Sequence, residues 1–261
     1  MKKIMLVAGI VFAIGLIGIL SLGITKEGFT FSAIFGKEVT IDETKSIAAD
    51  SIQKIKVAVG STDVNIMPTN GNDIEVHLYG KGNKEGINTM KFDVKQQGDQ
   101  LLIATGSTFF IGVQYADTTL DIRLPQKLYK KIEVNGSSGD MSIKELKADT
   151  IQVAASSGHI QAENLEGDMK FKLSSGKVDI SLESITKDIY VNASSGDINL
   201  DVKQEPTSLV LDFNSSSGKG KVDLPMNYET KTGNRIYGKL GSGEHTVKVN
   251  MSSGDFHFHT K

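Results

Sequence analysis

The sequence contains no cysteine and no tryptophan, and it has only two arginines and four prolines among its 261 residues. Without cysteine the chain forms no disulfide, no thiolate metal site and no cysteine nucleophile, and it carries no lipid-modified lipoprotein cysteine. The formal net charge is −2, from 29 basic and 31 acidic residues. A near-neutral chain with only Arg123 and Arg235 is not a strong nucleic-acid binder, because phosphate contacts need a concentrated basic patch.

A long apolar segment begins close to the first residue. Residues 4–24 run for 21 positions without a charge, and a helix of that length spans about 31 Å, the thickness of a bilayer core. Because Lys2 and Lys3 precede it, the positive-inside rule predicts a cytoplasmic N-terminus. The alternative is a cleaved signal peptide, but its apolar region is shorter and Leu22-Gly23-Ile24 is a poor cleavage site. We therefore expect an uncleaved single-pass anchor, with the lipid bilayer as its partner.

The chain divides into three parts. We expect residues 1–25 to be the cytoplasmic N-terminus and transmembrane anchor, residues 26–50 to be a juxtamembrane linker, and residues 51–261 to be an extracytoplasmic domain at the cell membrane. The part after residue 25 carries 27 basic and 31 acidic residues. Such a mildly acidic domain is not expected to bind anionic lipid headgroups by charge alone.

A tripeptide repeat occupies the second half of the chain. The glycines of its first five Ser-Ser-Gly copies are spaced 19, 18, 20 and 22 residues apart, and the sixth follows after 36 residues: Gly139, Gly158, Gly176, Gly196, Gly218 and Gly254. A degenerate copy, Gly241-Ser242-Gly243, lies inside the longest gap. A fixed period is typical of architectures in which each unit stacks on its neighbours.

Apolar and polar residues alternate on both sides of each copy. Ile151 and Val153 precede one turn, and Ile160 and Ala162 follow it, with polar residues between them. Strict alternation predicts strands with one buried face, and no useful helical period follows residue 25. We therefore predict an all-β fold, a β-solenoid with repeats of about 18–20 residues, preceded by one N-terminal transmembrane helix.

The repeat also predicts how the coils stack. Each turn of chain should lie on the previous one at about 4.8 Å, with the glycine at a corner where φ is positive. Leu146 and Leu165 should point inward, and Asp197 should neighbour Lys177 and a lysine of the following coil. Gly218-Lys219-Gly220 is interpreted as containing an extra residue pair. Outward residues should form two columns: Ser142, Gln161, Asp179, Asn199 and Asp223 in the first, and Lys144, Glu163, Ser181 and Asp201 in the second.

Within the predicted extracytoplasmic domain, residues 51–130 have the same chemistry with less regularity. We expect them to form an irregular N-terminal β cap, and residues 131–261 to form the regular repeats. Gly98-Asp99 is typical of a hairpin turn. Antiparallel strands in this part would cover the end of the stack, where an open solenoid leaves backbone groups unpaired.

Three stretches carry a resemblance to a known family: Leu124-Pro125, Lys131-Ile132-Glu133-Val134 and Ser137-Ser138-Gly139-Asp140. They resemble the bacterial "putative adhesin", or LiaG-like, membrane-anchored β-solenoid family, which repeats a strand, Ser-Ser-Gly-Asp, strand unit. The similarity covers residues 50–259. The resemblance implies a β-solenoid outside the membrane and an association with cell-envelope stress systems, and it supplies no catalytic residues.

Several residue types in the repeats could carry chemistry, and each has a structural alternative. His257 and His259 lie two apart in a predicted strand and could hold a metal, but the sequence supplies no further ligand. The aspartates after Ser-Ser-Gly are similar to those of calcium-binding nonapeptide repeats, although the period here is about twice as long. A serine nucleophile needs histidine and acid partners, whereas these serines recur in a turn. His77, His159 and His245 are scattered. We predict no catalytic, cofactor-binding or metal-ligating residue, and no cofactor.

These observations favour a non-enzymatic binding or scaffolding protein of a bacterial cell-envelope stress response. Its expected partners are other envelope proteins or a cell-wall polymer, and nucleic acid is not expected. One alternative is an adhesin that binds a cell-wall or host polymer, which an aromatic-lined groove would favour. A second alternative is a polysaccharide-modifying enzyme, which a carboxylate pair beside an arginine would favour.

Overall fold

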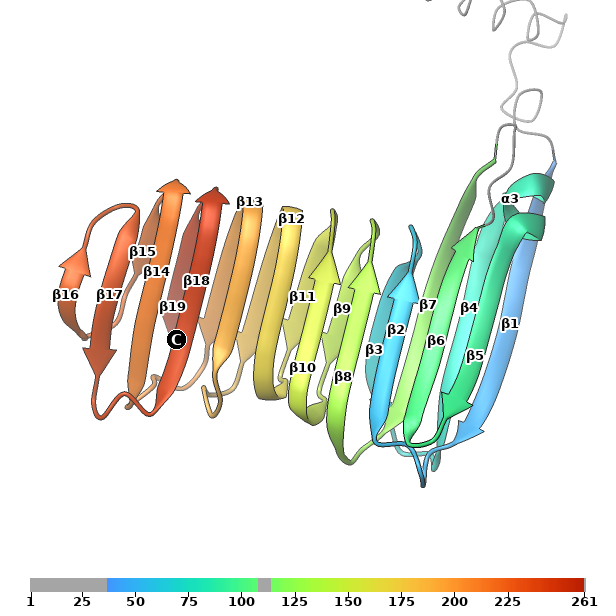
Figure 1. Cartoon of the computed structure of the whole chain (residues 1–261), viewed down its shortest axis with the longest axis horizontal. Coiled ribbons are helices and arrows are strands. Elements are labelled where there is room, and N and C mark those ends of the chain that lie inside the picture. Colours follow the sequence, from blue (N-terminus) through green and yellow to red (C-terminus); the bar gives the residue numbers. More distant parts are fainter. Residues whose placement is uncertain (1–36, 108–113, 261) are drawn as a thin grey trace, which may run out of the picture.

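The computed structural model describes residues 37–107 and 114–260. These residues form nineteen strands and one short helix, so the all-β prediction is confirmed (Figure 1). The strands are β1 (Glu38–Ala48), β2 (Lys54–Val59), β3 (Asp63–Thr69), β4 (Asp73–Asn83), β5 (Met90–Gln97), β6 (Gln100–Ser107), β7 (Ala116–Pro125), β8 (Leu128–Gly136), β9 (Met141–Lys144), β10 (Lys147–Ala155), β11 (His159–Glu163), β12 (Glu166–Leu182), β13 (Ile189–Val202), β14 (Leu209–Ser217), β15 (Gly220–Val222), β16 (Asn227–Lys231), β17 (Arg235–Leu240), β18 (His245–Ser253) and β19 (Phe256–Thr260).

The strands form two facing layers, which we call the first and second sheet. In the first sheet the neighbours follow the order β5, β6, β2, β8, β10, β12, β13, β18, β14, β17 and β16. In the second sheet the order is β1, β4, β7, β3, β9, β11, β12, β13, β19 and β15. Strands β12 and β13 belong to both sheets, because each continues through its Ser-Ser-Gly from one sheet into the other.

The core lies between the two sheets and is built from the apolar member of each alternating pair. Val134, Val153, Phe171, Val191 and Val249 pair in register across five neighbouring strands, and each is at most 1% exposed. The polar residues between them point outward. Because full burial of such a side chain contributes about 1.5–3 kcal/mol, these stacked columns are the main source of stability.

Each coil has two corners. At the Ser-Ser-Gly corner, all six glycines have φ between 105° and 151°, as predicted. At the return corner, Glu145 and Asn164 have φ of 53° and 49°. The leucines that follow them, Leu146 and Leu165, are buried, which confirms the inward orientation expected from the sequence.

The spatial order of the coils differs from the chain order at both ends, so the expectation that each turn lies on the previous one is wrong there. The last coil, β18 and β19, lies between β13 and the coil formed by β14 and β15. Likewise, β2 and β3 lie between β6–β7 and β8–β9. Antiparallel strands cover the outer coils: β16 and β17 at one end, and β1, β4 and β5 at the other (Figure 1). At the C-terminal end the chain forms the cap, β16 and β17, and then returns to the inner coil; at the N-terminal end the inner coil β2–β3 precedes the cap strands β4 and β5. In both places the antiparallel strands cover the outer coils.

The turn at Gly218 contains no extra residue pair, contrary to the interpretation of the sequence. Gly220 pairs with Phe256 and therefore occupies an inward position that apolar side chains occupy in other coils. A Cβ at Gly220 would lie 2.7 Å from the ring of Phe213. The large Phe213 ring fills this space, so glycine is the residue that fits beside it.

This register changes the predicted outward columns. Ser142, Gln161, Asp179 and Asn199 are neighbours as expected, but His257 follows Asn199 in this column. Asp223 lies instead in the second column, next to His259, because Val222 pairs with Phe258. The sequence placed Asp223 wrongly because the assumed insertion shifted it by two residues.

The one helix among the described residues is α3 (Lys84–Thr89), whose N-cap Asn83 accepts a hydrogen bond from the Gly86 amide at 2.9 Å. No helix within residues 37–107 and 114–260 is long and apolar enough to cross a bilayer. The predicted transmembrane segment, residues 4–24, lies outside the described residues.

Candidate functional site

The aspartates that follow the turn glycines, together with Asp63 at the equivalent position after Thr62, connect neighbouring coils. Each accepts a hydrogen bond from the backbone amide of the equivalent residue in the next coil, at 2.8–3.0 Å: Asp63 from Asp140, Asp140 from His159, Asp197 from Asp255, and Asp255 from Lys219. Asp197 thus neighbours Lys177 on one side, as predicted, and an aspartate rather than a lysine on the other. These carboxylates satisfy the backbone, which is a structural use of the repeated Asp.

The two C-terminal histidines lie on the same, outward side of β19, with ring centroids 5.8 Å apart. His259 Nδ1 lies 3.9 Å from the Asp223 carboxylate, which is the nearest acidic partner. Within the described part of the chain, no group of three or more His, Asp or Glu side chains is placed to hold a metal ion. The His257–His259 pair therefore lacks the further ligands that a metal site requires.

A denser polar network surrounds Asp179 on the outer face of the second sheet. Its carboxylate lies 2.6 Å from His159 Nε2, 2.6 Å from Asn199 Nδ2 and 2.8 Å from Lys177 Nζ. Partial burial would raise the pKa of Asp179, but hydrogen bonds from Lys177, Asn199 and His159 outweigh that effect and lower it. A carboxylate held charged by three partners is a poor proton acceptor, so this cluster is better suited to joining coils than to catalysis.

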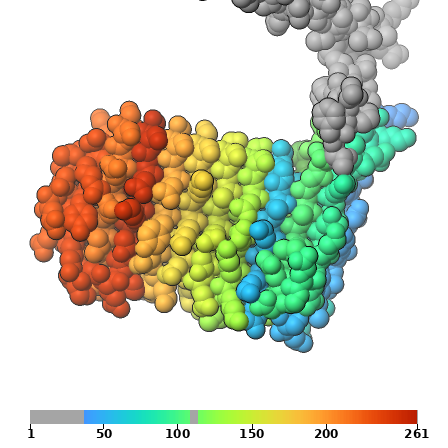
Figure 2. Space-filling model, viewed as in Figure 1, coloured from blue at the N-terminus to red at the C-terminus, as the bar shows by residue number. Residues whose placement is uncertain are grey.

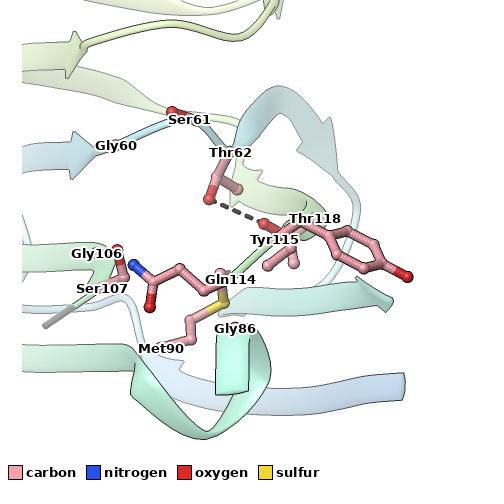
Figure 3. Close-up of a pocket in the computed structure, with 11 residues that line it drawn as sticks. Gly60, Ser61, Thr62, Gly86, Met90, Gly106, Ser107, Gln114, Tyr115 and Thr118 are labelled. Atoms are coloured by element: carbon pink, nitrogen blue, oxygen red, sulfur yellow. Dashed lines mark hydrogen bonds between the residues drawn. The ribbon is translucent and has the colours of Figure 1, made fainter. Parts of the chain in front are cut away.

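A small pocket lies near the N-terminal end of the stack, lined in part by the turn Gly60-Ser61-Thr62 (Figure 3). Three buried threonine hydroxyls meet there: Thr62 and Thr118 are 3.0 Å apart, and Thr105 donates to Thr62 at 3.2 Å. Met90 and Gln114 lie along the other side of the pocket (Figure 3). The hydroxyls satisfy one another, and among the described residues that line the pocket there is no carboxylate or imidazole to form an acid–base pair.

A larger groove, of about 620 Å³, crosses the outer face of the first sheet. It extends over four neighbouring strands, β8, β10, β12 and β13, which corresponds to roughly 14 Å along the stack at the usual strand spacing. Its lining is polar with one aromatic ring at the surface: Glu133, Asn135, Gln152, Ala154, Asp168, Lys170, Lys172, Asp188, Tyr190 and Asn192, with Val153 and Phe171 below. We call this feature the first-sheet groove.

The carboxylates of the first-sheet groove already have partners within the protein. Glu133 binds Lys131 at 2.7 Å, Lys56 at 3.3 Å and Asn135 at 3.0 Å. The hydrogen bond from Lys131 is the main reason that the pKa of Glu133 falls to about 2. Glu133 therefore stays ionised, and the charges of Lys131 and Lys56 balance its own. It is not available to act as an acid or base near neutral pH.

The two aspartates at the edge of the groove are also engaged. Asp188 accepts hydrogen bonds from the Thr246 amide at 2.8 Å and the Tyr190 hydroxyl at 3.1 Å. Asp168 accepts one from the Asp188 amide at 3.4 Å. They repeat, at a second corner, the coil-to-coil role of the aspartates that follow Ser-Ser-Gly.

Each arginine forms an ion pair with a single carboxylate among the described residues. Arg123 binds Glu75 at 2.9 Å, and Arg235 binds Asp212, which also accepts from Lys248 at 2.9 Å. Burial would raise the pKa of Asp212, but Lys248 and Arg235 together lower it. Both arginines therefore serve ion pairs between neighbouring strands in the described part of the chain.

Sequence reasoning did not identify the first-sheet groove. It examined outward residues only in the strands after each turn, whereas the groove is formed by strands before the turn. The alternation could have revealed it, since Glu133, Gln152, Lys170 and Tyr190 occupy equivalent outward positions in four successive units.

The two sheets of stacked Ser-Ser-Gly coils and a match to a family model together define the class of the protein. The Toastrack DUF4097 family model matches residues 52–168 and 156–258, which together cover most of the chain. The protein belongs to this family, and the resemblance drawn from the repeat is confirmed. No curated protein sequence matches the chain.

Several solved structures also align with the chain. One is described as a "putative cell adhesion protein" from Clostridium sporogenes, with 13% identity, a TM-score of 0.48, and coverage of 85% of this chain and 100% of that one. A "putative adhesin" from Bacteroides fragilis has 12% identity, a TM-score of 0.36, and coverage of 85% and 97%. A "putative adhesin" from Parabacteroides merdae has 13% identity, a TM-score of 0.30, and coverage of 84% and 96%. Family membership rests on the family model and not on these alignments.

Proposed function

We propose that the protein is a single-pass membrane protein whose β-solenoid domain lies outside the cell and acts as a non-enzymatic binding or scaffolding component of a cell-envelope stress response. The observation that carries the non-enzymatic part is the use of the repeated aspartates. They accept backbone hydrogen bonds between coils, so the motif that recurs most often serves stacking.

The membrane part of the proposal is supported by the sequence. Residues 4–24 are free of charge, and Lys2 and Lys3 precede them. This pattern favours a helix that crosses the bilayer with the N-terminus inside the cell. The link to envelope stress is supported only by the family resemblance.

An adhesin that binds a cell-wall or host polymer is the second candidate, and the first-sheet groove favours it. The groove is long and open along the stack, most of its lining side chains are of polar types, and Tyr190 provides one aromatic ring at its surface. A long groove of this kind suits an extended chain better than a compact small molecule.

Complementation of a deletion strain under cell-wall antibiotic challenge tests the proposal. Single alanine variants at Ser195, Asp197 and His257 should restore growth, and a chain lacking residues 4–24 should not. Protease added to intact protoplasts should digest the domain while a cytosolic control protein survives. A folded, correctly located alanine variant that fails to complement would contradict the non-enzymatic role, and a protected domain would contradict the topology.

A further inference from the structure

The outward faces of the two sheets carry opposite net charge. On the first sheet, strands β5 to β17 carry twelve exposed or partly exposed basic side chains: Lys54, Lys56, Lys91, Lys95, Lys130, Lys131, Lys147, Lys170, Lys172, Lys248, Arg235 and Lys239. The same face carries seven carboxylates: Asp93, Glu133, Asp149, Glu166, Asp168, Asp188 and Asp212. Figure 2 shows this face of the molecule. Because basic side chains outnumber carboxylates on it, the outward face of the first sheet is basic, although the whole chain has a net charge of −2.

The second sheet has the opposite balance. Its outward positions, with the aspartates at the turns, hold fourteen carboxylates: Glu38, Asp42, Asp63, Asp73, Glu75, Asp117, Asp121, Asp140, Glu163, Asp179, Asp197, Asp201, Asp223 and Asp255. Only six basic residues accompany them: Lys81, Arg123, Lys144, Lys177, Lys219 and Lys221. An anionic partner is thus attracted to the first sheet and repelled from the second.

Within the first-sheet groove, three polar side chains are unengaged. Gln152, Lys170 and Lys172 form no side-chain hydrogen bond or ion pair with any residue in the described ranges, whereas Glu133, Asp168 and Asp188 all have partners. Lys170 and Lys172 lie two residues apart on β12 and project to the same side. The unengaged side chains of the groove therefore offer two ammonium groups and one amide, and none of them is a carboxylate.

The length of the groove indicates the form of its ligand. It crosses four strands, which is roughly 14 Å along the stack axis, and it is open to solvent at the surface of the sheet. Further basic residues continue along the same axis on both sides, including Lys56 toward one end and Lys248 toward the other. A chain with regularly spaced acidic groups would meet lysines over several coils, whereas a small anion would meet one pair.

We propose that the first-sheet groove binds an acidic polymer, a chain whose repeating units carry phosphate or carboxylate groups, with Lys170, Lys172 and Gln152 as its main contacts. The inference rests on the proposed extracytoplasmic binding role, which places envelope polymers within reach. Lysine ammonium groups pair with either acid, and the Gln152 amide donates to polymer oxygens. Tyr190, at the same outward position of the next strand, supplies a flat surface for the polymer backbone.

Binding assays with the full chain in uncharged detergent micelles test the proposal. The probes are poly(glycerol phosphate), polygalacturonate and neutral dextran, together with phosphatidylcholine vesicles with and without phosphatidylglycerol. The test variant is Lys170→Gln with Lys172→Gln. The matched control is Lys219→Gln with Lys221→Gln, which makes the same charge change at the same spacing on the acidic face.

The native chain should bind at least one acidic polymer and not dextran, and its affinity should fall as salt increases. The test variant should bind about tenfold more weakly, and the control should change by less than about twofold. The two acidic probes decide whether phosphate or carboxylate is preferred. Four outcomes would each overturn the proposal. The affinity could fall equally in both variants, dextran could bind as tightly as the acidic polymers, only vesicles with phosphatidylglycerol could bind, or no polymer could bind.

The outcome is separable from that of the proposed function. If no polymer binds, yet the alanine variants complement and the chain lacking residues 4–24 does not, the polymer proposal fails and the binding or scaffolding role stands. If a folded alanine variant at Ser195, Asp197 or His257 fails to complement, the proposed non-enzymatic role fails whether or not polymer binds.

Discussion

Replacement of Gly196 by alanine tests the physical basis of the repeat. Gly196 has φ of 120°, a conformation that residues with a Cβ rarely adopt. A Cβ placed there would also collide with the backbone carbonyl of Gly176 in the neighbouring coil. The Gly196→Ala variant should therefore be destabilised by two separate effects: local backbone strain, and steric overlap between stacked coils.

The two effects can be given rough sizes. Backbone strain of this kind costs about 1–3 kcal/mol, and forcing extra volume into a packed region costs a further 1–3 kcal/mol or so. We expect a loss of about 4 kcal/mol, a large fraction of the 5–15 kcal/mol that stabilises a typical domain. For a domain of this size the midpoint of thermal unfolding should fall by roughly 12 °C.

Two other glycines separate the contributions. Gly98, in the β5–β6 hairpin turn that the sequence predicted, has φ of 62° but no atom within 4 Å of an added Cβ. Gly60 has neither a positive φ nor a neighbour within 4 Å. Gly98→Ala should therefore cost about 1 kcal/mol, and Gly60→Ala should be neutral or slightly stabilising, within about 1 kcal/mol.

Urea unfolding of the full chain in uncharged detergent, followed by far-ultraviolet circular dichroism, measures these differences. The expected order of destabilisation is Gly196→Ala, then Gly98→Ala, then Gly60→Ala. If Gly196→Ala costs no more than Gly98→Ala, the close stacking of the turn glycines contributes nothing to stability. If all three variants equal the native chain, the whole account of the turn is refuted.

Two further predictions concern pH and the order of the coils. The pKa of Glu133 is about 2 in the folded protein against 4.5 normally, so its ionised form stabilises the fold above pH 4.5 and this contribution is lost as pH falls toward 2. In urea titrations, Glu133→Gln should cost about 1 kcal/mol at pH 7 and progressively less below pH 4.5; a constant difference would contradict the ion-pair network. Deletion of residues 245–261 should abolish cooperative unfolding, because it removes an inner coil and exposes both β13 and β14; a sharp transition in the truncated chain would contradict the observed stacking order.

The sequence predicted the repeating unit well because its determinants are local. Alternation identifies the buried residues, and the positive φ at each turn requires glycine, so the strands, the corners and the inward Leu146 and Leu165 could all be predicted. Neighbours across coils are not local. The chain reverses at β16 and β17 before it returns as β18, and nothing within residues 245–260 indicates that they pair with β13 and β14.

The first-sheet groove was missed for a related reason. Its residues are individually ordinary outward positions, and their significance depends on which strands are adjacent and which side chains are already engaged. Lys131 and Lys170 look alike in the sequence. Only the structure shows that Lys131 binds Glu133 at 2.7 Å while Lys170 has no such partner among the described residues. The opposite charges of the two faces also depend on which strands share a face, so a net charge near zero does not reveal them.

The column of residues after the turn glycines explains why the Ser-Ser-Gly-Asp motif is imperfect. In stacking order it reads Asp63, Asp140, His159, Lys177, Asp197, Asp255 and Lys219. Each pair of stacked aspartates is followed by a histidine or a lysine. The second aspartate of the pair accepts a hydrogen bond from the backbone amide of that residue. A third consecutive carboxylate would add repulsion between like charges at strand spacing. The departures from Asp therefore limit repulsion within a structural ladder, and residues outside that ladder, such as Gln152 and Lys170, are the ones left to bind a partner.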